Sequence, residues 1–323
     1  MPMCNGKWVR QKSVIATNNV VELPKELDIK GPKVALAINM FFVNNKAFLH
    51  AIDQKVKLNS CVVLGTKKKK EGYDKEILFS GIDKVLWFYN HADAYIKTIH
   101  ADNEFCSFME ELIDQWDVDI NFSNPGEHVP DIKRDNKTQQ ERFRVNLYWP
   151  PFKIILHSMI NYLNLQIAKN CSLFPKKNGI SRYYLPHTIL NFRHFDFDRE
   201  FKYSFEDYVQ AYKENAPKHN NLPQSLDCIY PRAKDSQQGG HQLMDLAMGQ
   251  MIWQPRVEAC KMTRVVIDQV KELVQRQGYK MLKYFNRKRE QMQLLPADLL
   301  KGLVSGPPTH QNKFIGNADD KYW

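Results

Sequence analysis

Residues 34–43, VALAINMFFV, decide the fold class of this chain. The stretch is apolar at nearly every position, which is typical of a central strand that is covered on both faces. Two more strands are predicted at residues 47–52 and 60–64. Asn44-Asn45 offers a tight first turn, because Asn tolerates a positive φ. Three strands joined by short connections predict an antiparallel meander.

Helices and strands alternate after the meander. An amphipathic helix is predicted over residues 73–90, then a strand at 95–100, a helix at 104–115 and a short fifth strand at 118–122. A long apolar helix follows at 152–170. This order predicts an α/β fold with a mixed five-stranded sheet flanked by helices. It is the element order of the ribonuclease H-like fold.

The rest of the chain divides by composition. We expect an irregular segment at residues 1–30, the ribonuclease H-like core at 31–195 and a small β module at 196–255, where short strand-like pieces surround a Gly239-Gly240 turn. A basic helical segment, with a helix that begins near Val265, is expected at 256–304. The polar tail at 305–323, rich in Gly, Pro and Asn, is expected to be disordered.

Composition excludes several classes of protein. The chain has 323 residues, of which 43% are hydrophobic and 25% charged, as in globular proteins. It contains no run of about 18 apolar residues, and its first residues lack the apolar core of a signal peptide. We therefore expect an intracellular protein that does not contact a membrane. The nucleus is one compartment in which it could be located. The six cysteines are scattered, which predicts neither a disulfide framework nor a zinc site.

The charge balance favours a polyanionic partner. The net charge is +10 and the isoelectric point about 9.1, which is compatible with nucleic acid. Residues 256–290 hold ten Lys or Arg against four Asp or Glu, a difference of six, and residues 67–70 are four lysines. Each group has two interpretations, a solvated surface or a nucleic-acid contact.

Several short motifs carry a resemblance to one family. Residues 100–105 (HADNEF) and 127–136 (EHVPDIKRDN) resemble segments of the integrase cores of copia-type retroelements. Further matches follow in the family's order, from about residue 34 to residue 273: FP at 174–175, GIS at 179–181, PxxIL at 186–190, YVQ at 208–210 and QGG at 238–240. Each match is weak, but the ordered set is specific.

The resemblance implies a polynucleotidyl transferase whose catalytic Asp, Asp and Glu hold two divalent metal ions at a phosphodiester. The second acid is retained as Asp102, whereas Asn39 stands at the first position and Lys133 at the third. We therefore expect a degenerate triad with little or no activity and no cofactor, or Mg²⁺ or Mn²⁺ if activity remains. Glu104 is a weak second ligand beside Asp102, and Asp102 has the simpler alternative of capping a helix.

Four basic residues, Arg134, Lys137, Arg142 and Arg144, recur at helical spacing after Lys133. They form either a solvated helix face or a surface that lies along DNA, which is the expected partner. The chain has the further alternative of forming a homo-oligomer. Three functions remain: a degenerate integrase core, a host-adopted DNA-binding or scaffold protein without catalysis, and a weakly active enzyme whose metal is held by Asp102 and Glu104.

Overall fold

The structure is a computed structural model that describes residues 20–27, 31–43, 46–66, 75–102, 105–106, 109–123, 130–148, 151, 155–212, 225–233, 239–276, 284–285 and 291–292. The chain forms two units, Met1–Lys280 and Met281–Trp323. In the second unit the described residues are two antiparallel strands, β11 (Tyr284–Phe285) and β12 (Gln291–Met292). The predicted tail at 305–323, the lysines at 67–70 and Glu104 lie outside the described residues.

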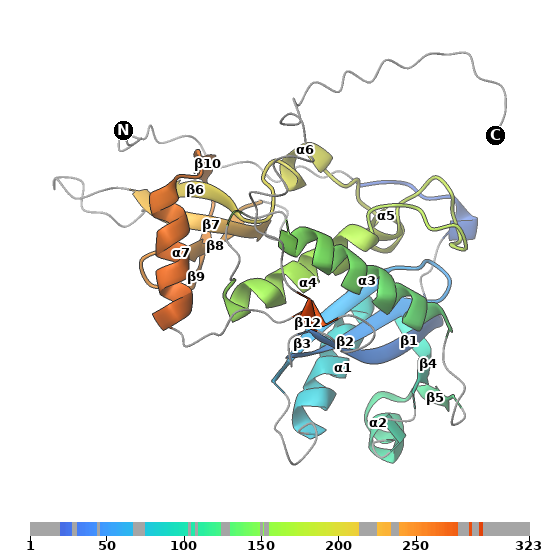
Figure 1. Ribbon diagram of the computed structural model, residues 1–323. Coiled ribbons are helices and arrows are strands. Elements are labelled where there is room, and N and C mark those ends of the chain that lie inside the picture. The colour runs from blue at the N-terminus through green and yellow to red at the C-terminus, as the bar shows by residue number, and fades with distance from the viewer. Residues whose placement is uncertain are drawn as a thin grey trace. The chain divides into compact units, whose positions relative to one another are not determined.

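The first unit is built on a five-stranded sheet in the order β3-β2-β1-β4-β5 (Figure 1). The strands are β1 (Gly31–Val43), β2 (Lys46–Asp53), β3 (Asn59–Thr66), β4 (Ala94–Ala101) and β5 (Asp119–Phe122). The first three pair antiparallel, whereas β4 pairs parallel with β1 and β5 parallel with β4. Helices α1 (Lys75–Asn90) and α2 (Met109–Trp116) supply the connections that parallel neighbours need. The predicted mixed sheet flanked by helices is confirmed, in the arrangement expected of the ribonuclease H-like fold.

Helices cover both faces of β1, which explains why residues 34–43 are apolar at nearly every position. Leu36 and Ile38 belong to the large core that also contains the buried residues of α1. Ala37 packs on the opposite side with Ile52 and with Ile132 from α3 (Pro130–Tyr148). Helix α4 (His157–Cys171) contacts α3 and β3. Between α3 and the sheet, polar side chains are buried as well, among them His50 and Gln139.

A second sheet follows the core, as expected of the small β module. Its order is β10-β6-β7-β8-β9, and all its pairs are antiparallel. The strands are β6 (Asp207–Tyr212), β7 (Ser225–Ala233), β8 (His241–Asp245), β9 (Met251–Gln254) and β10 (Val257–Ala259). The short helices η1 (Lys25–Leu27), α5 (Pro186–Asn191) and α6 (Phe197–Glu200) precede it along the chain. The domain boundaries themselves stay predictions.

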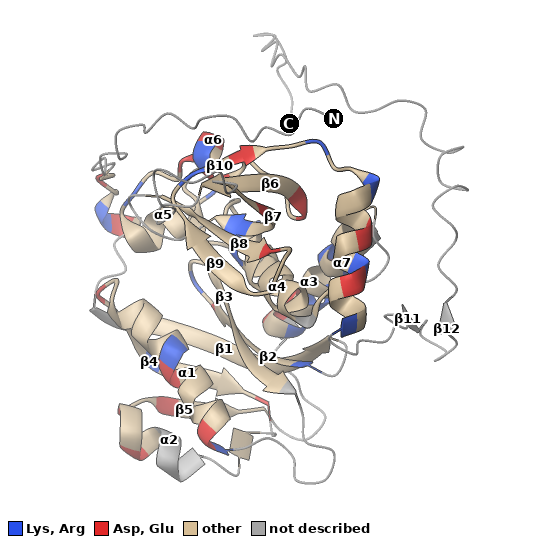
Figure 2. Cartoon of the chain, turned by 90° about the vertical axis from the view of Figure 1, so that its left-hand side faces the viewer, with Lys and Arg blue, Asp and Glu red and all other residues tan. Residues whose placement is uncertain are grey.

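The predicted C-terminal helix is α7 (Arg264–Arg276), which buries Val266, Val270, Leu273 and Val274. Basic and acidic residues alternate along this helix (Figure 2), and Lys271 pairs with Asp268 at 3.0 Å. Most of the excess positive charge of residues 256–290 lies beyond the described part of this segment. None of the helices in the described ranges is long and apolar enough to cross a membrane.

Candidate functional site

Asn39, Asp102 and Lys133 meet at one edge of the core sheet. Parallel pairing of β1 with β4 sets Ile38 beside Ala101, so the residues that follow each of them, Asn39 and Asp102, are neighbours. Asn39 Nδ2 donates a hydrogen bond of 2.9 Å to Asp102 Oδ2. Lys133, in the first turn of α3, places its Nζ 3.9 Å from the same oxygen.

The second oxygen of the Asp102 carboxylate also has a donor. The hydroxyl of Ser123, which directly follows β5, lies 3.3 Å from Asp102 Oδ1. Sequence reasoning missed Ser123. The available signal was its position after the strand that runs parallel to β4, because the carboxyl ends of adjacent parallel strands share one edge of a sheet. The Asp102 side chain keeps 19% of its surface exposed, so the site faces solvent.

The residues present do not fit a site for two divalent metal ions. Hard ions of this kind need several oxygen ligands, and crowding two dications requires negative charge. Asn39 turns its NH₂ group toward Asp102, and Lys133 brings a positive charge. Within the described ranges, no three His, Cys, Asp or Glu side chains gather as a ligand set.

The acids nearest in sequence to Lys133 point elsewhere. Asp131 accepts a hydrogen bond of 2.7 Å from Lys57 Nζ, and Asp135 one of 2.6 Å from Lys176 Nζ. Each lies about 200° around α3 from Lys133. Neither is positioned to replace the missing carboxylate.

The outer surface of α3 carries the four predicted DNA-contacting residues. Arg134, Lys137, Arg142 and Arg144 are all exposed. The exposed Glu141 lies between these basic residues, and its carboxylate is 3.9 Å from Lys137 Nζ, one helical turn away. The structure does not bring these four residues to Asp102; it places them along the helix that starts beside it.

A buried polar cluster lies on the opposite side of α3. His50, on β2, is completely buried, with Nδ1 2.5 Å from Asn136 Oδ1 and Nε2 3.0 Å from Asn59 Oδ1. Gln139 Nε2 and Asp135 Oδ2 lie 2.8 Å and 3.4 Å from the same Nε2. Burial lowers the pKa of His50, although the nearby Asp135 carboxylate opposes this. The cluster fixes α3 on the sheet by side-chain contacts.

Sequence reasoning did not find this cluster. Its signal is a run of polar side chains, Asp135, Asn136 and Gln139, on the helix face that also carries the buried Ile132 and Phe143. Polar residues on an apolar face require buried partners.

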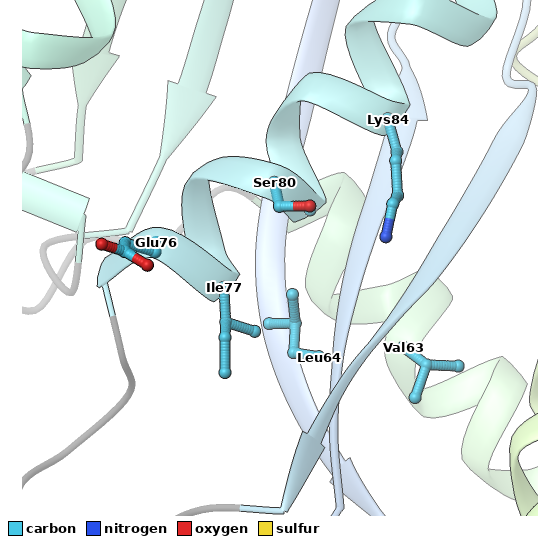
Figure 3. Close-up of a pocket in the computed structure, with 7 residues that line it drawn as sticks. Val63, Leu64, Glu76, Ile77, Ser80 and Lys84 are labelled. Atoms are coloured by element: carbon cyan, nitrogen blue, oxygen red, sulfur yellow. The ribbon is translucent and has the colours of Figure 1, made fainter.

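The α1 side of the sheet has a separate groove (Figure 3). It holds about 350 Å³ between β3 and α1 and is lined by Val63, Leu64, Glu76, Ile77, Ser80, Gly81 and Lys84. Helix α1 approaches β3 so closely here that a Cβ on Gly81 would lie 2.6 Å from Leu64 Cδ2. The groove does not share residues with the Asp102 site.

Comparison with known proteins gives only distant likenesses. No protein-family model matches the chain, and no curated protein matches it. Among solved structures, it is similar to the catalytic core domain of BIV integrase at 14% identity and a TM-score of 0.35, over 48% of this chain and 92% of that one. It is also similar to a chain of the simian T-cell lymphotropic virus intasome, solved in complex with PP2A regulatory subunit B56 gamma. The identity there is 13% and the TM-score 0.35, over 73% of this chain and 86% of that one. At these values neither likeness carries evidence about the activity of this chain.

Proposed function

We propose that this chain is an integrase core of the copia type with a degenerate triad, which binds duplex DNA through α3 and has lost metal-dependent strand transfer. The assignment to the copia type rests on the sequence motifs that resemble this family. The loss of catalysis rests on one observation, the pairing of the single retained acid. Asp102 accepts a hydrogen bond from the Asn39 amide and faces the Lys133 ammonium, so the two other triad positions bind this carboxylate themselves.

The exposed bases of α3 support the DNA-binding part of the proposal. Phosphate contacts by Lys and Arg supply sequence-independent affinity that falls steeply with salt. Arg134, Lys137, Arg142 and Arg144 are exposed on one helix that begins at the proposed former metal site. Assembly of several copies and a nuclear location stay predictions.

The test combines binding with chemistry. Fluorescence anisotropy on a labelled duplex, titrated between 50 and 200 mM salt, measures binding, and nicking and strand transfer with Mn²⁺ measure catalysis. The unaltered protein is run beside an Asn39→Asp/Lys133→Glu double variant, which restores the family's three acids. We expect salt-sensitive binding by both proteins, and nicking by the double variant alone.

Two outcomes contradict the proposal. Mn²⁺-dependent nicking by the unaltered protein, lost on Asp102→Ala, would establish a retained enzyme with a different ligand set. Absence of duplex binding at 50 mM salt would remove the nucleic-acid function, whatever the nicking assay gave. Binding without nicking by either protein would support the DNA-binding role and place the loss of catalysis in more than these two positions.

A further inference from the structure

The Lys133 ammonium stands where it can contact two anions at once. Its Nζ lies 3.9 Å from Asp102 Oδ2, which is close enough for an ion pair but too far for a hydrogen bond. The side chain keeps 37% of its surface exposed, and no other ion pair or hydrogen bond of this ammonium occurs within the described ranges. An ammonium has three donors, so donors remain for a ligand that approaches from solvent.

The charge at the site has changed in the direction that admits a phosphate. The family's three acids sum to a charge of −3, whereas Asn39, Asp102 and Lys133 sum to zero. A site with three carboxylates repels a phosphodiester unless metal ions intervene. A neutral site with an exposed ammonium does not need them, because a Lys side chain binds phosphate as a compact point charge.

Lys133 also begins a row of bases along α3. At 100° per residue, Lys137 lies 40° and Arg144 20° around the helix from Lys133. Along the axis, at 1.5 Å per residue, they follow at about 6 Å and about 16 Å. Both are exposed. Phosphates of one B-DNA strand rise about 3.4 Å along the duplex axis per base-pair step, so the row has the axial length of about five steps.

We propose that Lys133 takes over the bridging role of a metal ion, linking Asp102 to a backbone phosphate of duplex DNA at the first contact of this row, so that DNA engages the site without divalent cations. The inference rests on the proposed DNA binding by α3. The inference adds a phosphate contact at Lys133, in the proposed former metal site. DNA binding by Arg134, Lys137, Arg142 and Arg144 does not by itself require this contact.

The test compares single charge changes in the full chain. Anisotropy on a labelled duplex, over 50–200 mM salt, is measured for the unaltered protein, Lys133→Gln, Lys133→Arg and Lys84→Gln. Lys84 is an exposed lysine on α1, so its change alters net charge equally on another face of the sheet. Each titration is repeated with EDTA and with Mg²⁺ at constant ionic strength, and thermal melting checks that every variant folds.

We expect Lys133→Gln to make the negative slope of log affinity against log salt shallower by about 0.9, the contribution of one phosphate contact. Binding at 0.1 M salt should weaken by about eightfold. Lys133→Arg keeps the charge and should stay within twofold of the unaltered protein, as should Lys84→Gln. EDTA should leave the affinity of the unaltered protein unchanged.

The failures are distinguishable. If the unaltered protein binds DNA and Lys133→Gln behaves like Lys84→Gln, the phosphate site is wrong while DNA binding stands. A requirement for Mg²⁺ in the unaltered protein would also overturn the inference. If the unaltered protein does not bind the duplex, the proposed function fails and this inference fails with it.

Discussion

Asn39→Asp is the most informative single change, because it introduces the acid that the resemblance implies at this position while Lys133 stays in place. The substitution replaces a donor with a second carboxylate beside Asp102. The 2.9 Å hydrogen bond from Asn39 Nδ2 to Asp102 Oδ2 is lost, and two negative charges face each other. We expect a folded but less stable protein.

The size of the effect follows from the geometry. A hydrogen bond to a charged group contributes about 1.5–3 kcal/mol. Two carboxylates about 4 Å apart, at an effective dielectric constant of about 20, repel each other by about 4 kcal/mol. The Lys133 ammonium and solvent offset part of this, because Asp102 is only partly buried. With this offset, the expected loss is about 3 kcal/mol of unfolding free energy at pH 7.

The assay is urea unfolding, followed by tryptophan fluorescence, of the unaltered protein, Asn39→Asp and Asn39→Ala. Asn39→Ala loses the hydrogen bond without the repulsion, so Asn39→Asp should be the less stable of the two at pH 7. Millimolar Mn²⁺ should stabilise only Asn39→Asp. Equal stability of the two variants at pH 7 would refute the account of this site.

Three further changes test other parts of the structure by urea unfolding. Gly81→Ala should gain less than the about 1 kcal/mol by which Ala exceeds Gly inside a helix, because its Cβ would force the Leu64 side chain to shift, and the full gain would disprove this tight approach. Burial, aided by Lys202, lowers the pKa of His241 to about 4, below its ordinary 6.5, so stability should fall by about 1 kcal/mol, allowing for solvent screening, between pH 7 and pH 5. His241→Gln should remove the part of the loss that is due to His241, whereas the part due to the buried His50, whose pKa is also lowered, should remain; an equal loss in the variant would contradict the assignment. Burial raises the pKa of Glu206 well above its ordinary value, so stability falls as pH rises above about 4.5; Glu206→Gln should be more stable than the unaltered protein at pH 7, and a less stable variant would count against it.

The core sheet could be predicted because its strands carry local signals. The apolar run of β1 marks a strand covered on both faces, and the short connections to β2 and β3 fix antiparallel pairing. The proximity of Asn39, Asp102 and Lys133 followed from the family pattern alone, because 63 residues separate the first two and no periodicity links them. The structure gives the physical link, which is the parallel register of β1 and β4.

The sequence carries a signal for Ser123 and for the His50 cluster, but it does not identify the residues that they contact. Each depends on contacts between segments far apart in sequence, and each residue type is common outside such sites. The hydrogen bond between His50 and Asn136 joins residues 86 positions apart. Polar residues on one face of a helix indicate that partners exist, but the sequence does not say which strand supplies them.

Contacts away from Asp102 tie α3 to the core. In a two-metal site the ions join the carboxylate of the helix to those of the strands. Here α3 is tied by Asp131 to Lys57, at 2.7 Å, and by Asn136 to the buried His50 on β2. These contacts do not involve Asp102, so the loss of metal ligands at positions 39 and 133, which the proposed function implies, would not release the helix. The consequence is measurable, because the melting temperature of the unaltered protein should be the same in EDTA and in Mg²⁺, whereas a fold held by bound metal would melt at a lower temperature in EDTA.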